Sequence, residues 1–102
     1  MATLKKVAEK KDIPEGGGKA VEVNGKTIAL FHVGGKYYAI DDACTHAGGN
    51  LSEGSLEGNV VTCPWHGATF DITSGKVLSA PAGDNVASYS VKVEGEDIKV
   101  EV

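Results

Sequence analysis

The sequence lacks a long apolar run and contains few cysteines. No stretch approaches the ~20 consecutive apolar residues of a membrane-spanning helix, so we expect no membrane anchor. Residues 1–12 carry four lysines and no apolar segment of the kind found in secretory signals, which predicts a cytoplasmic protein. Cys44 and Cys63 are the only cysteines, and a reducing cytosol disfavours a disulfide between them. Metal binding or redox chemistry is therefore their expected role.

Basic side chains are also in the minority. Ten lysine and arginine residues stand against 14 aspartate and glutamate residues, for a formal net charge of −4. This acidic excess argues against a nucleic-acid binder that neutralises phosphates, and it suits docking onto a basic protein patch. Asp41, Asp42, Glu53 and Glu57 are candidates for an acidic docking face, although a solvated surface is the simpler interpretation.

The chain of 102 residues has the size of one compact domain, and we predict a single domain over residues 1–102. Its 41% hydrophobic and 24% charged residues are typical of a globular protein. The sequence contains no recognisable internal repeat, linker or self-association patch, so we expect a monomer.

Short segments separated by glycines predict an all-β sandwich or barrel. Asn24-Gly25 is a strong hairpin signal, because a type I′ turn requires positive φ at both central positions. A helix is hard to place anywhere, and residues 3–8 are predicted to form an edge strand. Further strands are expected at 19–23, 27–33, 37–41, 60–62, 69–72, 77–78, 89–93 and 98–102. Residues 42–58 have weak strand character, and a long loop in a small domain is usually functional.

Both cysteines and two of the three histidines fall in two short motifs, Cys44-x-His46 and Cys63-x-x-His66. The first motif lies in the long predicted loop. Two residues span at most ~7 Å when extended, so Cys44 and His46 can reach one small metal centre. Two such loops that face each other would form a site with two thiolates and two imidazoles.

Three chemistries compete for these four side chains. A zinc site accepts two cysteines and two histidines, but its usual motifs pair cysteine with cysteine and histidine with histidine. A thioredoxin-like site requires C-x-x-C, and here His66 takes the place of the second cysteine. A binuclear iron–sulfur centre in which two histidines replace two cysteines on one iron suits mixed pairs, since each loop then gives one ligand to each iron. We favour the iron–sulfur interpretation, and zinc stays open.

The two motifs, with Gly67 after the second, resemble the signature of Rieske-type [2Fe–2S] proteins, and the similarity extends from about residue 37 to residue 81. The resemblance implies a small all-β sandwich with two cluster-binding loops at one end, at about 42–50 and 63–68. A third loop, which contains a proline, would lie at about 79–83.

The resemblance also implies one Rieske-type [2Fe–2S] cluster as the cofactor. Cys44 and Cys63 would bind its inner iron, and His46 and His66 would bind its outer, solvent-facing iron.

Several positions depart from the high-potential members of that family. Those proteins join a second cysteine of each loop in a disulfide, whereas this sequence has Gly49 and Trp65. They also place a serine and a tyrosine where this sequence has Ala68 and Phe70, so two hydroxyl donors that stabilise the reduced cluster are missing. We therefore expect a potential at the low end of the Rieske range, around −150 mV. In these respects the chain resembles the ferredoxins of ring-hydroxylating oxygenases.

That resemblance implies a one-electron carrier and not an enzyme. The donor would be an NAD(P)H-dependent reductase with a flavin or an iron–sulfur centre, and the acceptor a terminal non-haem iron oxygenase acting on aromatic or similarly inert compounds. The chain cannot assemble a 2-His-1-carboxylate iron site of its own, since only His32 is left over. We interpret His32, within the strand predicted at 27–33, as structural. Two alternatives stay open: the small Rieske-like subunit of an assimilatory nitrite reductase, and a zinc-stabilised interaction module.

Overall fold

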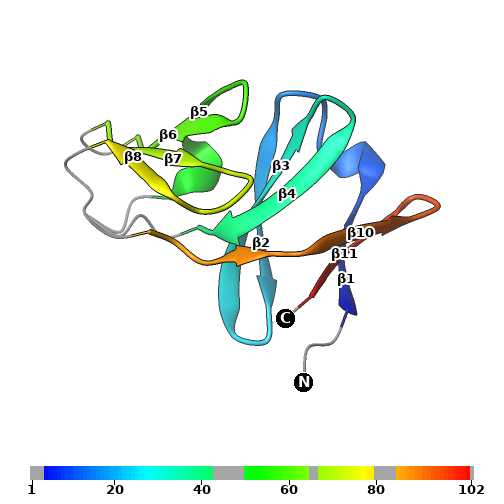
Figure 1. The fold of residues 1–102 in the computed structure, drawn as a ribbon. Helices are drawn as coiled ribbons and strands as arrows, with labels where there is room; N and C mark the ends of the chain where they lie inside the picture. Colours follow the sequence, from blue (N-terminus) through cyan, green and yellow to red (C-terminus); the bar gives the residue numbers. More distant parts are fainter. Residues whose placement is uncertain (1–3, 43–49, 65–66, 80–84, 102) are drawn as a thin grey trace.

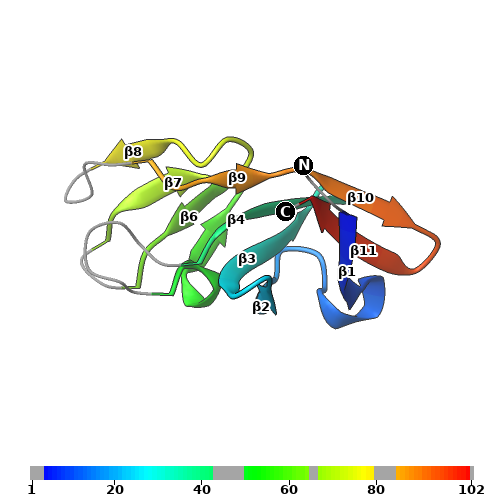
Figure 2. The same cartoon turned by 90° about the horizontal axis from the view of Figure 1, so that it is seen from below.

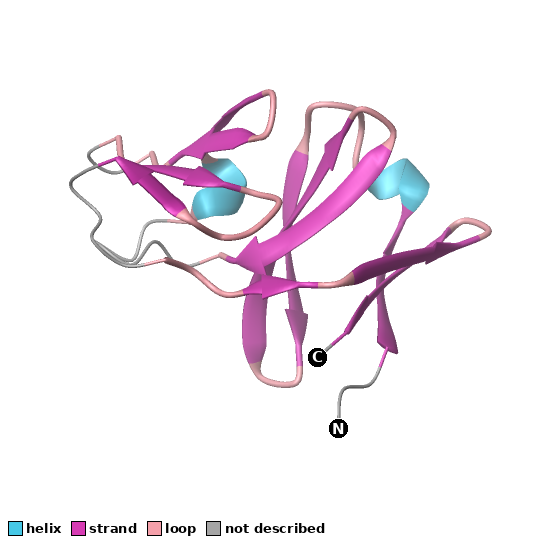
Figure 3. Ribbon diagram, in the orientation of Figure 1, coloured by secondary structure: helices cyan, strands magenta, loops and turns pink. Residues whose placement is uncertain are grey.

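The computed structural model describes residues 4–42, 50–64, 67–79 and 85–101. These residues form three antiparallel sheets (Figure 1), and the predicted all-β fold is confirmed. Strands and two short 3₁₀ turns are the regular elements of the described residues, as the colouring in Figure 3 shows. No helix of the described part is long and apolar enough to cross a membrane.

The central sheet has the strand order β2-β3-β4-β9. Its strands are β2 (Gly18–Val23), β3 (Lys26–Val33), β4 (Lys36–Asp41) and β9 (Ser88–Tyr89). The outer sheet, in the order β1-β11-β10, consists of β1 (Leu4–Glu9), β11 (Asp97–Glu101) and β10 (Val91–Glu94). The loop-side sheet is formed by β5 (Ser55–Glu57), β6 (Val60–Thr62), β7 (Thr69–Asp71) and β8 (Val77–Ser79).

The central sheet separates two hydrophobic cores because β3 is apolar on both faces. Ile28 and Leu30 point into one core and Ala29 and Phe31 into the other, as the two-residue period of a strand requires. We call the first the far core; its buried members are Ala8, Ile13, Val21, Val23, Ile28, Leu30, Ala39, Ile98 and Val100. We call the second the loop-side core; its buried members are Ala29, Phe31, Ile40, Leu51, Val61, Cys63, Ala68, Phe70, Ile72 and Val86. Figures 1 and 2 show the loop-side and outer sheets at opposite ends of the molecule.

The β2–β3 hairpin confirms the predicted turn. Asn24 and Gly25 both have positive φ, of 52° and 77°, and they connect the paired residues Val23 and Lys26. This conformation matches the twist of the flanking strands, which favours two-residue turns of this kind.

Most predicted strands are present, with ends that differ by one or two residues. The strand predicted at 89–93 is instead divided between β9 and β10, which lie in two different sheets. The strand at 60–62 is found with its predicted bounds, and β1 is an edge strand as expected, since it pairs with β11 only. The prediction of one long loop over 42–58 was incomplete. Leu51–Glu53 forms a 3₁₀ turn and Ser55–Glu57 forms β5. With a single apolar residue, Leu56, β5 has no pattern from which it could have been recognised.

Candidate functional site

The first predicted loop starts from a buried carboxylate. Asp42 follows β4 directly, and only 2% of its surface is exposed. Its Oδ1 accepts a hydrogen bond of 2.8 Å from the Ser52 amide, and its carbonyl oxygen accepts one of 2.7 Å from the Leu51 amide. The Asp42 amide in turn donates to the Thr27 carbonyl oxygen at 3.1 Å. These bonds connect Asp42 with Leu51 and Ser52, which follow the first loop, and with Thr27 at the start of β3.

The second predicted loop is the turn of the β6–β7 hairpin. The register pairs Thr62 with Thr69, and the next residues inward are joined by a bond of 2.7 Å from the Cys63 amide to the Ala68 carbonyl oxygen. Gly67 has a φ of +75°, which a residue with a side chain adopts only at a cost. Cys63 and Ala68 are both buried in the loop-side core, so the two ends of this loop are fixed by packing as well as by hydrogen bonding.

The third predicted loop leaves the sheet beside the second. Ser79 ends β8, and its Oγ lies 2.7 Å from Thr69 Oγ1 and accepts a bond of 3.2 Å from the Thr69 amide. On the returning side, Asn85 Oδ1 accepts from the Val77 amide at 2.9 Å, and the Val86 amide donates to the Gly75 carbonyl oxygen at 2.9 Å. Both ends of this loop are therefore anchored to the loop-side sheet.

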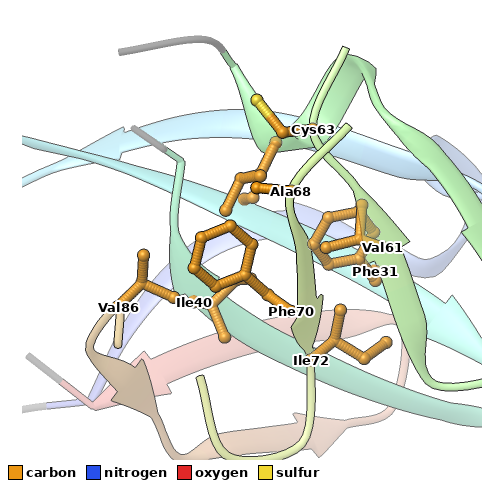
Figure 4. Close-up of a cluster of buried hydrophobic side chains, with 10 residues drawn as sticks. Phe31, Ile40, Val61, Cys63, Ala68, Phe70, Ile72 and Val86 are labelled. Carbon is orange, nitrogen blue, oxygen red and sulfur yellow. The ribbon is translucent and has the colours of Figure 1, made fainter. Parts of the chain in front are cut away.

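The described ends of all three loops meet in the loop-side core, which contains Leu51, Cys63, Ala68 and Val86. In Figure 4, Cys63 lies at the end of this core, next to Ala68, with its sulfur directed away from Phe70. Hydrogen-bonded ends on all three loops and a thiol at the edge of an apolar core suit a metal centre, because a site of this kind needs its ligands held by a rigid scaffold.

Of the four predicted ligands, only Cys63 belongs to the described residues. Cys44, His46 and His66 lie outside them, as do Gly49, Trp65 and Pro81. Within the described ranges no group of three or more histidine, cysteine, aspartate or glutamate side chains is placed to hold a metal. The four-residue ligand set therefore stays a prediction, supported here by the position of Cys63.

Ala68 and Phe70 are both completely buried, next to the predicted cluster loops. They pack in the loop-side core, and neither carries a hydroxyl that could donate to a cluster. The structure thus places apolar surface where the high-potential proteins of the resembled family have hydroxyl donors. The low reduction potential expected from these two apolar residues stays a prediction.

The proposed acidic docking face needs correction. The Asp42 carboxylate is buried and hydrogen-bonded, and the Asp41 carboxylate accepts a bond of 2.6 Å from the Tyr89 hydroxyl. Neither is available to a partner in the way a solvated carboxylate would be. Glu53 and Glu57 are exposed on the loop-side end and remain candidates.

His32 is structural, as the sequence indicated. Its Nδ1 lies 2.9 Å from the Ile13 carbonyl oxygen, and its ring stacks on Tyr37 with 4.2 Å between ring centroids.

Nearby, the Glu15 carboxylate accepts hydrogen bonds from the Gly34 and Gly35 amides, which lower the pKa of this carboxyl. Sequence reasoning missed Glu15 as an anchor for the β3–β4 turn, because the two segments are 19 residues apart and no local pattern links them.

Comparisons with known proteins identify relatives along most of the chain. Residues 3–90 match the family described as Rieske [2Fe-2S] domain. A naphthalene 1,2-dioxygenase/salicylate 5-hydroxylase ferredoxin component from Ralstonia sp. is 47% identical over 83 residues, which cover 81% of this chain and 80% of the relative.

Solved structures agree with the sequence relatives. The ferredoxin of carbazole 1,9a-dioxygenase from Nocardioides aromaticivorans IC177 superposes with a TM-score of 0.92 at 30% identity and covers 96% of each chain. A chain in the complex of reduced oxygenase and oxidized ferredoxin in carbazole 1,9a-dioxygenase gives a TM-score of 0.88 at 34% identity, over 95% of this chain and 91% of that one. A putative nitrite reductase small subunit from Mycobacterium tuberculosis has a TM-score of 0.90 at 21% identity, covering 100% of this chain and 96% of that one; this likeness extends to the fold alone.

Proposed function

The chain belongs to the Rieske [2Fe–2S] domain family, and from this premise we propose that it is a one-electron carrier that serves a terminal oxygenase. The observation that carries the proposal is its 47% identity, over 81% of its length, to a ferredoxin component of a dioxygenase system. The protein is then an electron-transfer component and not a catalyst. A nitrite reductase subunit is the weaker interpretation, because the solved nitrite reductase subunits that match are 21% and 22% identical, which extends to the fold alone.

One Rieske-type [2Fe–2S] cluster supplies the redox chemistry when bound, by accepting and releasing one electron. We propose that Cys44 and Cys63 bind the inner iron and that His46 and His66 bind the outer iron. Two thiolates neutralise the charge of the oxidised core, so reduction leaves the site with one negative charge. The chain's own contribution at Cys63 is a buried thiol at the end of the loop-side core, held by the bond between the Cys63 amide and the Ala68 carbonyl oxygen.

The partners follow from this function. We propose a terminal non-haem iron oxygenase as the acceptor and an NAD(P)H-dependent reductase, with a flavin or an iron–sulfur centre, as the donor. We further propose a monomer that works in the cytoplasm and consists of one domain over residues 1–102. Relatives from naphthalene and salicylate systems support an aromatic compound as the final substrate of the oxygenase.

The test is a metal and spectroscopic analysis of the purified protein. We expect two irons and two sulfides per chain, a red-brown colour, and after dithionite reduction the anisotropic EPR signal, of low average g, of a Rieske centre. His66→Cys should keep iron bound but shift the spectrum towards that of all-cysteine ferredoxins. A colourless protein with one zinc would overturn the proposal and leave a zinc-stabilised module, and an unchanged Rieske spectrum in His66→Cys would overturn the ligand assignment.

A further inference from the structure

The junction between β4 and β9 carries a cluster of hydrogen bonds around one carboxylate. Asp41, the last residue of β4, accepts a bond of 2.6 Å from the Tyr89 hydroxyl through Oδ1 and one of 3.3 Å from the Ala87 amide through Oδ2. Its own amide donates to the Ala87 carbonyl oxygen at 2.9 Å. Among the described residues, the bond from Tyr89 to Asp41 is the one partly buried hydrogen bond between two side chains.

These bonds extend a very short strand pairing. β9 has two residues, and they pair with β4 only at Ala39 with Tyr89 and Ile40 with Ser88. The Tyr89 ring also packs against the far core, and Lys26 Nζ of β3 lies 5.7 Å from its centroid. The Asp41 contacts therefore add to the two residue pairs by which β9 joins β4.

The position of this junction in the chain connects two of the predicted cluster loops. Asp41 is followed by Asp42 and then by residues 43–49, which include two predicted ligands. Ala87 follows Val86, which packs in the loop-side core directly after the third predicted loop. The Asp41 carboxylate therefore binds the start of the first loop to the end of the third, across 46 residues of sequence.

We propose that Tyr89 and Asp41 are positioning residues of the cluster site: their hydrogen bonds hold the first and third loops in register and thereby set the environment of the cluster. This inference rests on the proposed function, since it needs a cluster to act upon. Neither residue is a ligand. Their effect arises because mutation of groups that support metal ligands typically changes metal affinity or activity by about 10- to 100-fold.

Tyr89→Phe tests the proposal because it removes only the hydroxyl. The loaded protein should lose its visible absorbance about tenfold faster in the presence of a chelator, as expected for loss of a ligand-orienting contact. Its midpoint potential and the g values of its reduced EPR signal should also shift. Tyr37→Phe is the matched control, since Tyr37 packs against the same far core as Tyr89 but stacks on His32, near the end of β4 opposite Asp41.

A purely structural role would lower the melting temperature of Tyr89→Phe and leave its potential and g values at those of wild type, and that result would overturn the inference. If Tyr89→Phe does not fold, Asp41→Asn takes its place. It keeps an oxygen for the Tyr89 hydroxyl and loses the acceptor for the Ala87 amide, and the same spectroscopic shifts are expected at smaller size. A wild-type protein without a Rieske signal would instead overturn the proposed function, so the two failures are distinguishable.

Discussion

Asp42 shows how one buried carboxylate holds the start of a functional loop. Its side chain is the single buried charged group of the described residues, and it accepts the Ser52 amide. Asp42→Ala should therefore lower the free energy of unfolding by about 1.5–3 kcal/mol, since the amide loses a charged acceptor. Asp42→Asn keeps an oxygen at this position and should be clearly less destabilising. Urea unfolding of both variants checks this, and an Asp42→Ala protein as stable as wild type would contradict it.

Ala68 and Phe70 are expected to influence the reduction potential as well as to pack in the loop-side core. Both are buried beside the predicted cluster loops, and neither offers a hydroxyl. The double variant Ala68→Ser, Phe70→Tyr should raise the reduction potential above the value of around −150 mV that we expect for the wild type, because hydroxyl donors stabilise the reduced cluster. A spectroelectrochemical titration measures the change. A double variant with an unchanged or lower potential, or a wild type at +200 mV or more, would refute the explanation.

At the scale of single elements, the turn after β7 depends on a glycine. Gly75 has a φ of +79°, and a Cβ there would overlap the Val86 carbonyl oxygen. Gly75→Ala should therefore be at least about 1 kcal/mol less stable than Gly58→Ala, which has a similar φ of +59° but open space around the added methyl. Thermal unfolding of the two variants compares them directly. Equal stabilities would show that the chain relaxes around Gly75 without cost.

The contact between β9 and β4 also predicts a dependence on pH. Burial, followed by the hydrogen bond to Asp41, raises the pKa of Tyr89 from 10.0 to about 12. Between these two values the unfolded chain loses the phenol proton while the folded protein keeps it, so this contribution to stability is complete below pH 10 and is lost as the pH rises to 12. The stability of wild type should thus fall more steeply over this interval than that of Tyr89→Phe. The free energy of unfolding of both proteins can be measured by urea unfolding at pH 9 to 12. An equal dependence of this free energy on pH in the two proteins would contradict the prediction.

Elements with a local signal were predictable from the sequence. The Asn24-Gly25 turn and the β-branched strand Val60–Thr62 carry their conformational preferences in neighbouring residues, and the structure confirms both. The hydrogen bond between Tyr89 and Asp41 has no such signal, because its partners are 48 residues apart and meet only when the sheet forms. For the same reason, Asp42 could not be recognised as buried from a sequence in which it looks like any surface acid.

The kind of metal centre could be predicted from the ligand residue types, whereas the arrangement of the loops around it could not. Two cysteines and two histidines in mixed pairs favour an iron–sulfur centre whatever the fold around them, and the family comparison agrees. How the loops are anchored depends on contacts that no motif encodes, such as the bond from the Thr69 amide to Ser79 Oγ. Of the predicted ligands, the described residues include only Cys63, and the other three stay predictions.

On the scale of the whole molecule, charge is distributed unevenly. Residues 42–84 carry five acidic side chains and one lysine, whereas the rest of the chain carries nine of each sign. The net charge of −4 therefore belongs to the part of the chain that holds the predicted cluster loops. An uneven field of this kind accelerates the approach of an oppositely charged partner, and the acceleration weakens as salt screens it.

The charge distribution predicts which carboxylates influence electron transfer. Glu53→Gln with Glu57→Gln should slow reduction of a partner oxygenase severalfold at low ionic strength, with a smaller effect at high salt. Glu22→Gln with Glu101→Gln removes the same charge from exposed positions in the evenly charged part and is the matched control. Stopped-flow kinetics across a salt series distinguishes the pairs. Equal rates for the two double variants would exclude steering by the loop-side end.

The position of β3 between the two cores has a consequence for how the protein unfolds. Ile28 and Leu30 of β3 belong to one core and Ala29 and Phe31 to the other. β4 likewise contributes Ala39 to the first core and Ile40 to the second, so the two cores share these two strands. If one of the two cores unfolds, the other therefore loses part of the sheet that encloses it. Loss of iron from the loop-side end would therefore destabilise the far core as well. The metal-free protein should then be cleaved by proteases along its whole length.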